Sequence, residues 1–360
     1  MPVDLLILSR YGPLGASSRV RSYQYLESLR KAGFTVEVRP MFDNAYVAAR
    51  NSSVGAPRFA DVARAYWTRL RSIPAISRAR AIWVEYELLP WLPFVAEHWL
   101  YASARPVIVD YDDAIFHRYD QHPLASVRRV LGRKIGRIMA SATVVIVGNE
   151  YLAERARDSG AKSVHVLPSV VDLERYRQRS TFSPDECVVG WVGSRSTTPH
   201  LRSISSILGN VAGPLRLRLV NVGGAHCTIP GVRVDNCMWS EDSEIERMLE
   251  FDVGVMPLPD EPWTRGKCGY KLIQYMGCGL PTIASPVGAN AQIVDHGTTG
   301  LLASTAHEWE HALTTLARSP RLRSDMGLRG YERAAQRYSL AVTAPKLVAI
   351  VQSVVPRGGH

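Results

Sequence analysis

Cysteine is scarce in this 360-residue sequence, and long apolar runs are absent. None of the five cysteines forms a C-x-x-C pair, which argues against a zinc site. Their odd number favours a reducing compartment, and the apolar start of the chain, with no basic region before it, predicts no secretory signal. No apolar stretch reaches the roughly 18–20 residues of a spanning helix, and the nearest, residues 81–100, is broken by glutamates and prolines. The five cysteines are Cys187, Cys227, Cys237, Cys268 and Cys278.

Solenoid repeats and low-complexity segments are also missing, and the 46% hydrophobic and 21% charged residues are ordinary for a globular protein. No nucleic-acid-binding module and no basic patch interleaved with aromatic residues is present, so we expect no nucleic-acid partner. Single cores rarely exceed about 250–300 residues, and a chain of this length therefore predicts two domains.

Positive charge is concentrated in the first half of the chain. The net charge is +10, with 23 Lys and Arg against 15 Asp and Glu in residues 1–165, but 20 against 18 in the remainder. This asymmetry indicates either a solvated basic surface or an acidic partner such as an anionic membrane leaflet. Residues 124–139 predict a basic helix that either touches such a membrane or turns an ordinary solvated face outward. Its cations are Arg128, Arg129, Arg133, Lys134 and Arg137.

Short apolar runs alternate with helical patterns, which predicts parallel α/β sheets. We predict two doubly wound Rossmann-like domains, residues 1–167 and 168–339, with a terminal helix at 340–354 packing back on the first. Ligands of such sheets bind beyond the carboxyl ends of the strands, so the domains are expected to face a cleft. The predicted strands are 5–8, 34–38, 81–84, 107–109, 144–147, 164–167, 187–192, 215–222, 232–234, 253–256 and 282–284.

The segment 260–285 predicts a loop, a helix start, a helix, a glycine stop and a strand. A helix N-terminus presents unpaired N–H groups and a partial positive charge, which suit a diphosphate. Gly269 permits close approach of the backbone, Lys267 and Lys271 are spaced to share a helix face, and Gln274 lies one turn further on. The pattern fits a site for a diphosphate and a ribose, or equally an amphipathic helix with solvated lysines.

Several pieces in order resemble family 4 glycosyltransferases: residues 167–172, 254–257, 274–290 and 297–302. The resemblance is dense from about 165 to 305 and looser before it. It implies a GT-B fold and a retaining enzyme that needs no metal and no cofactor. It also implies a nucleotide-sugar donor held mainly by the second domain, with a UDP-sugar favoured and a GDP-sugar next, and an acceptor held mainly by the first.

The chain departs from the family pattern at the helix start. The family places two glutamates eight residues apart there, and the matching positions are Gly266 and Gln274. Gln274 still offers donors and an acceptor to ribose hydroxyls, whereas Gly266 offers no carboxylate, for which Asp260 or Glu261 would have to substitute. The donor-binding candidates in this segment are Lys267, Gly269, Tyr270, Lys271 and Gln274.

In each domain, a loop with candidate site residues follows the first predicted strand. After strand 187–192 come Gly193, Ser194 and Arg195, where the family has a basic pair that neutralises the leaving diphosphate. Arg195 fits the first member of that pair, with His200 or Arg202 as the second, or it is simply a surface arginine.

After strand 5–8 comes a glycine loop in which Gly15 allows close approach to the nucleotide-sugar donor. Three residues of this loop supply hydrogen-bond donors on the acceptor side. These three are Ser17, Ser18 and Arg19.

Asp110, Asp112 and Asp113 follow the strand 107–109. Asp-x-Asp is a metal motif in the GT-A fold, but the resemblance to GT-B leads us to expect no metal here. Asp112 stands where the family often has a histidine near the reacting sugar, and it would orient the acceptor hydroxyl or take its proton. The alternative is an aspartate-rich helix cap. We predict Asp112, Arg195 and Lys271 as catalytic, with Asp110 and Asp113 on the acceptor side.

These residues together predict a hexosyltransferase of polysaccharide or related biosynthesis, acting on a glycan, a lipid-linked saccharide or a small molecule. We expect it in the cytoplasm, with peripheral contact to the inner face of an anionic membrane through the first domain. The alternatives are a catalytically degenerate binding or scaffold subunit, suggested by Gly266, and, less favoured, a nucleotide-sugar epimerase.

Overall fold

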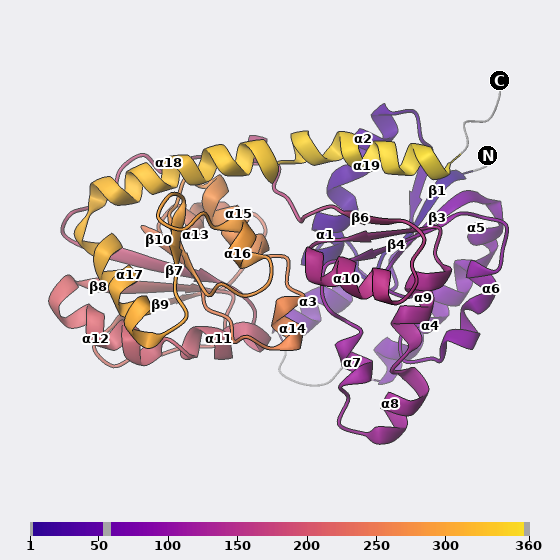
Figure 1. Cartoon of the computed structure of the whole chain (residues 1–360), viewed down its shortest axis with the longest axis horizontal. Coiled ribbons are helices and arrows are strands. Elements are labelled where there is room, and N and C mark those ends of the chain that lie inside the picture. Colours follow the sequence, from indigo (N-terminus) through magenta and orange to yellow (C-terminus); the bar gives the residue numbers. More distant parts are fainter. Residues whose placement is uncertain (1–2, 53–58, 356–360) are drawn as a thin grey trace. The chain divides into compact units, whose positions relative to one another are not determined.

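The computed structural model describes residues 3–52 and 59–355, and the chain divides into two compact units (Figure 1). The first contains the described parts of Met1–Ser169, Gly266–Cys268 and Thr343–His360, and the second contains Val170–Arg265 and Gly269–Val342. Each unit is built on one six-stranded sheet whose neighbouring strands are all parallel. The predicted doubly wound α/β class is therefore confirmed.

The sheet of the first unit has the strand order β2-β1-β3-β4-β5-β6. Strand β1 lies between two partners, and Leu5 pairs with Val36 on one side and with Ala81 on the other. Residues 5–8 of β1 and the apolar residues of β4 are buried, as expected for parallel strands covered on both faces. The strands are β1 (Val3–Leu8), β2 (Val36–Val38), β3 (Ala79–Glu85), β4 (Val107–Tyr111), β5 (Val144–Val147) and β6 (Val164–Val166).

Two of the larger helical regions of the first unit differ from the prediction. The predicted helix 124–139 is two helices, because the chain turns at Gly132 and Arg133, and glycine is a weak helix former. The region 44–78, for which we predicted no element, holds three helices. The helices are α1 (Ala16–Arg21), η1 (Tyr23–Tyr25), α2 (Leu26–Lys31), α3 (Asn44–Ser52), α4 (Phe59–Arg71), α5 (Ile73–Arg78), η2 (Phe94–Ala96), α6 (His98–Tyr101), α7 (His117–Asp120), α8 (Ala125–Leu131), α9 (Lys134–Ser141) and α10 (Glu150–Asp158).

The sheet of the second unit has the order β12-β11-β10-β7-β8-β9. Its edge strand β12 was not predicted, because the strand has only two apolar residues after Gly300 and glycine is depleted in strands. The core joins the inner side chains of the sheet to helices α12 and α17. The strands are β7 (Cys187–Val192), β8 (Leu217–Val222), β9 (Arg233–Cys237), β10 (Val253–Met256), β11 (Thr282–Ala284) and β12 (Gly300–Leu302).

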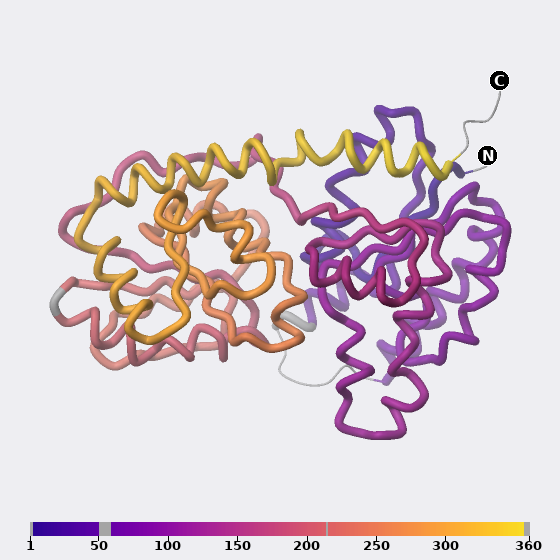
Figure 2. Tube along the Cα trace, viewed as in Figure 1, coloured from indigo at the N-terminus to yellow at the C-terminus, as the bar shows by residue number. Residues whose placement is uncertain are grey.

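The helices of the second unit separate its strands, and Figure 2 follows their path along the chain. The last helix, α19, has the predicted bounds and continues from Thr343 into the first unit, where the hydroxyls of Thr343 and Tyr25 lie 3.2 Å apart. The helices are η3 (Leu173–Arg175), η4 (Arg195–Thr197), α11 (Thr198–Arg202), α12 (Ser205–Leu215), α13 (Glu244–Met248), α14 (Pro262–Arg265), α15 (Tyr270–Gly277), α16 (Asn290–Ile293), α17 (Ala306–Arg318), α18 (Pro320–Arg337) and α19 (Leu340–Val354).

Candidate active site

The loop after β7 in the second unit is shaped by contact between Gly193 and Trp191. A Cβ on Gly193 would lie 2.0 Å from the indole of Trp191, so only glycine fits at this position. The amide of Gly193 donates to the carbonyl of Val222, and Ser194 begins η4 with a capping box. The loop therefore holds Ser194 and Arg195 exposed at the carboxyl end of β7.

Helix α15 is fixed to the same strand end through Tyr275. The hydroxyl of Tyr275 accepts a hydrogen bond of 3.0 Å from the amide of Val192, the last residue of β7. The Tyr275 ring also fills the space beside Gly254 of β10, where a Cβ would lie 2.3 Å from the ring. At the other end, Gly269 precedes the helix with φ of 64°, a left-handed conformation that favours glycine.

Lys271 lies in the first turn of α15, and its ammonium is 5.6 Å from the centroid of the Trp191 ring. The structure thus brings Lys271 and the Gly193 loop together around one tryptophan. Tyr270 precedes Lys271 and is half-buried. A lysine beside the N–H groups of a helix N-terminus forms an arrangement suited to binding a phosphate group.

The three polar residues considered for the two glutamate positions of the family differ in their surroundings. Gln274 is buried, and its amide donates to the hydroxyl of Tyr176 at 3.3 Å, so its predicted contact with a ribose remains a prediction. Asp260 accepts two hydrogen bonds from Arg265, at 2.6 and 3.1 Å, which lower the pKa of Asp260. Glu261 is exposed.

Lys267 lies between α14 and α15, in the segment 266–268 that belongs to the first unit, and not on the helix of Lys271. Its ammonium is 3.5 Å from the carboxylate of Asp113, and its carbonyl accepts a hydrogen bond from Asn149. The prediction that Lys267 and Lys271 share one helix face is therefore wrong. The reason is Gly269, whose left-handed conformation delays the start of the helix until Tyr270.

Asp110 has a structural role in the buried core of the first unit, contrary to the prediction of an acceptor contact. Its carboxylate accepts hydrogen bonds of 2.6 and 2.9 Å from the guanidinium of Arg21, and both side chains are buried. Arg21 also donates to the carbonyl of Leu167. Both carboxylate oxygens are therefore occupied inside the protein.

The predicted glycine loop is held by Glu85, the last residue of β3. The carboxylate of Glu85 accepts hydrogen bonds from the hydroxyls of Ser17 and Ser18, at 2.8 and 2.5 Å, and from the amide of Arg10 at 2.8 Å. Burial raises the pKa of Glu85, while these hydrogen bonds act in the opposite direction. Ser17 and Ser18 thus support the loop in this structure, where we predicted that they face an acceptor.

The glycine of this loop also serves close packing. A Cβ on Gly15 would lie 2.3 Å from the Cβ of Tyr11, so the turn into α1 requires glycine. Arg19 follows in α1 and is half-buried.

Asp112 is half-buried beside the carboxyl end of β4. The hydroxyl of Tyr86 donates to its carboxylate, and the backbone of Tyr86 has a left-handed φ of 64°, which is uncommon for tyrosine. Burial, followed by the charge of Asp113, raises the pKa of Asp112 to about 8. The thiol of Cys268 donates a hydrogen bond of 3.0 Å to the backbone carbonyl of Asp112. A carboxyl with a pKa near neutrality is suited to proton transfer.

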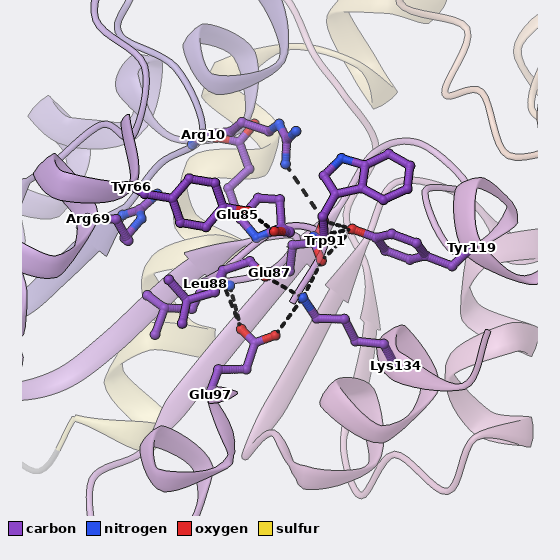
Figure 3. Close-up of polar contacts among 12 residues, drawn as sticks. Arg10, Tyr66, Arg69, Glu85, Glu87, Leu88, Trp91, Glu97, Tyr119 and Lys134 are labelled. Carbon is purple, nitrogen blue, oxygen red and sulfur yellow. Dashed lines mark hydrogen bonds and ion pairs between the residues drawn. The ribbon is translucent and has the colours of Figure 1, made fainter. Parts of the chain in front are cut away.

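A buried charge cluster supports the loop after β3 (Figure 3). The ammonium of Lys134 lies 2.7 Å from Glu87 and 3.0 Å from Glu97, with all three side chains enclosed. The hydroxyl of Tyr119 donates to Glu87 at 2.8 Å. The assignment of Lys134 to a solvated or membrane face is therefore wrong. The glutamates that interrupt residues 81–100 were the sequence signal for this cluster, and we took them for breaks in an apolar run.

The fold places the chain among the GT-B proteins, and solved structures share it over nearly the whole length. Sucrose-phosphate synthase from Thermosynechococcus elongatus superposes with a TM-score of 0.74 at 17% identity, over 98% of this chain and 99% of that one. HepE from Anabaena, solved in complex with UDP-glucose, gives a TM-score of 0.68 at 16% identity, over 98% and 99%. At these identities the likeness establishes the fold alone.

Sequence comparison finds a family match for one region of the chain. Residues 207–319 match the family described as Glycosyl transferases group 1. A stretch of 78 residues is 36% identical to D-inositol 3-phosphate glycosyltransferase from Pseudarthrobacter chlorophenolicus, covering 21% of this chain and 17% of that protein. The chain thus matches less than a fifth of the length of this curated relative. The chain thus has the GT-B fold, and one region of it is similar to group 1 glycosyltransferases.

Proposed function

We propose that the protein is a retaining glycosyltransferase that transfers a hexose-type sugar from a nucleotide-sugar donor, with a UDP-sugar favoured over a GDP-sugar. The observation that carries this proposal is the position of Lys271 at the start of α15, over Trp191 and beside the Gly193 loop. Helix α15 lies inside the region that matches the group 1 glycosyltransferases, and HepE, a structural neighbour, was solved with UDP and with UDP-glucose.

In the proposed reaction the donor diphosphate binds at the N-terminus of α15, with Lys271 and the exposed Arg195 as its cations. The bond from the anomeric carbon to the phosphate oxygen breaks while the acceptor oxygen bonds to that carbon on the same face. The proton of the acceptor hydroxyl passes to the departing phosphate oxygen. Positive groups that face this oxygen stabilise the charge that develops on it. Asp112 in the first unit orients the acceptor hydroxyl, and no metal is required.

The test is the melting temperature of the protein with UDP-, GDP-, ADP- and dTDP-sugars and the free nucleotides, each with Mg²⁺ or with EDTA. A ligand that binds the folded state raises the melting temperature by mass action. We expect a shift with one nucleotide base, with and without EDTA, that is lost in Lys271→Met. Lys346→Met, an exposed lysine in α19, should keep it. Absence of any shift at millimolar ligand would contradict the proposed donor site.

A second candidate is a binding subunit that has lost catalysis, and Gly266 favours it. The space of a side chain at this position is filled by Ala114, so no carboxylate reaches a sugar from here. Such a protein would bind a nucleotide yet release no labelled sugar to any acceptor in a crude glycan and lipid extract. Label transfer that disappears in Lys271→Met would exclude this candidate.

A further inference from the structure

Helix α4 carries large apolar side chains on its exposed face. Phe59 is 88% exposed, Trp67 56% and Leu70 45%, and Ala63 is also exposed. These four positions are separated by four, four and three residues, so the helical period places them on one side. Ile73, just beyond the end of the helix, is a further exposed apolar residue.

The opposite face of α4 fixes the helix to the first unit. Ala65 and Arg69 are buried, and Arg69 donates to the carbonyls of Ser9 and Arg39, at 2.7 and 3.2 Å. These contacts of Ala65 and Arg69 on the opposite side of α4 therefore keep its apolar face turned outward. A soluble helix normally directs such residues inward, and exposed apolar stretches mark interaction surfaces.

Arginines flank the apolar face. Arg64 lies three residues before Trp67 and Arg71 four residues after it, so both are its neighbours on the helix. Both arginines are exposed, and the guanidinium of Arg71 is 5.1 Å from the centroid of the Trp67 ring. The acidic residue of α4 is Asp61, which is half-buried. Cations beside exposed aromatic side chains are complementary to an anionic lipid surface.

The loop after β3 contacts α4 and carries further exposed apolar side chains. The hydroxyl of Tyr66 in α4 donates to the carbonyl of Pro90, and the next residue, Trp91, is 46% exposed. Figure 3 shows Tyr66 and Trp91 around the same buried cluster. Leu92 follows and is also exposed. Tryptophan side chains have an apolar body and one polar N–H group, and they favour the boundary between lipid headgroups and acyl chains.

We propose that α4 lies flat on an anionic membrane, with Phe59, Trp67 and Leu70 inserted at the headgroup boundary, Arg64 and Arg71 against lipid phosphates, and Trp91 beside them. The contact is with the surface of the lipid bilayer. No helix among the residues described is long and apolar enough to cross a membrane. The proposal stands independently of the donor site, because it uses none of the residues assigned to the nucleotide sugar.

The test is co-sedimentation of the purified chain with vesicles of phosphatidylcholine alone, or of phosphatidylcholine with phosphatidylglycerol. We expect binding to the anionic vesicles at least tenfold above binding to the neutral ones, weakened by high salt. Phe59→Gln/Trp67→Gln/Leu70→Gln should lower anionic binding at least tenfold, and Arg64→Gln/Arg71→Gln should remove the preference for anionic lipid. Met238→Gln, an exposed apolar residue of the second unit, should bind as the wild type does.

Because all the substituted side chains are exposed, circular dichroism and the melting temperature should stay unchanged and show that the variants fold. The proposal is overturned if the wild type remains in the supernatant with both kinds of vesicle, or if the triple variant binds as well as the wild type. It is also overturned if gel filtration shows a wild-type dimer that the triple variant loses while neither binds vesicles. The face would then join two copies of the chain.

Discussion

Gly266 faces Ala114 so closely that a Cβ on Gly266 would lie 2.4 Å from the Cβ of Ala114. The backbone nitrogen and Cα of Ala114 would also lie within 2.8 and 3.0 Å, so a change of rotamer cannot relieve the contact. Both residues belong to the first unit. The missing carboxylate at Gly266 is thus part of the packing of the segment 266–268 on the loop after β4.

Gly266→Ala should therefore destabilise the protein by about 1–3 kcal/mol, the usual penalty for overpacking a close contact. Urea unfolding gives the free energy of unfolding. Gly213→Ala is the control, since Gly213 lies in α12 with no atom within 4 Å of an added Cβ. An alanine there should change stability by less than about 1 kcal/mol, because the gain in helix propensity is opposed by Pro214, the next residue. Equal effects of the two substitutions would contradict the packing described for Gly266.

The fold was predictable where the sequence carries continuous apolar runs between glycine or proline residues. Strands Cys187–Val192 and Val253–Met256 have their predicted bounds for this reason. We predicted no helix between residues 44 and 78, although the apolar residues of α4 recur at helical spacing. In α4 the large apolar side chains point outward, and buried Arg69 occupies the inner face. Hydrophobic periodicity therefore indicates a helix in α4 but assigns its buried side to the wrong face.

The site was predictable where its residues are local in sequence. Lys271 and the glycine before its helix lie within one short segment. The partners that hold Asp110 and Ser18 are 89 and 67 residues away, at Arg21 and Glu85. Such pairs depend on which strands become neighbours, and no local pattern records that. The sequence therefore indicated polar residues at the strand ends but not which of them remain available to a ligand.

Lys134→Met should lower the free energy of unfolding by about 3–5 kcal/mol. The substitution would leave two carboxylates, Glu87 and Glu97, buried without the ammonium that compensates them. Arg137→Met, an exposed cation on the same helix, should change stability by less than about 0.5 kcal/mol. Urea unfolding of both variants measures the difference. A small effect of Lys134→Met would show that solvent reaches the cluster.

Glu85→Gln should loosen the loop between β1 and α1. An amide has one acceptor oxygen, so it cannot receive the three donors that Glu85 receives from Arg10, Ser17 and Ser18. We expect a loss of about 1–3 kcal/mol in stability and faster proteolytic cleavage of this loop. Glu154→Gln, an exposed glutamate of α10, is the matched control. Unchanged cleavage rates in Glu85→Gln would show that other contacts hold the loop.

The raised pKa of Asp112 predicts a pH-dependent stability. Its pKa is about 8 in the folded protein, against roughly 3.9 for an unperturbed aspartate, so the folded state binds a proton that the unfolded chain releases. The stabilisation is complete below about pH 4 and is lost as the pH rises through 8. Between pH 5 and pH 8.5, the melting temperature of the wild type should fall relative to that of Asp112→Asn. A constant difference between the two proteins across this range would contradict the raised pKa.

The raised pKa of Asp112 also predicts how the transferase activity depends on pH. If the ionised carboxylate of Asp112 orients the acceptor hydroxyl, kcat/KM should rise with pH and level off above about pH 8. Asp112→Asn should lose this rise and lower kcat/KM by about 10²–10⁴-fold, the usual contribution of a positioned acid or base. Because Asp112 belongs to the first unit, the melting-temperature shift with the donor nucleotide should persist in the variant. A variant that keeps both the rate and the pH profile of the wild type would remove Asp112 from the reaction, whereas loss of nucleotide binding would reveal a defect in the donor site.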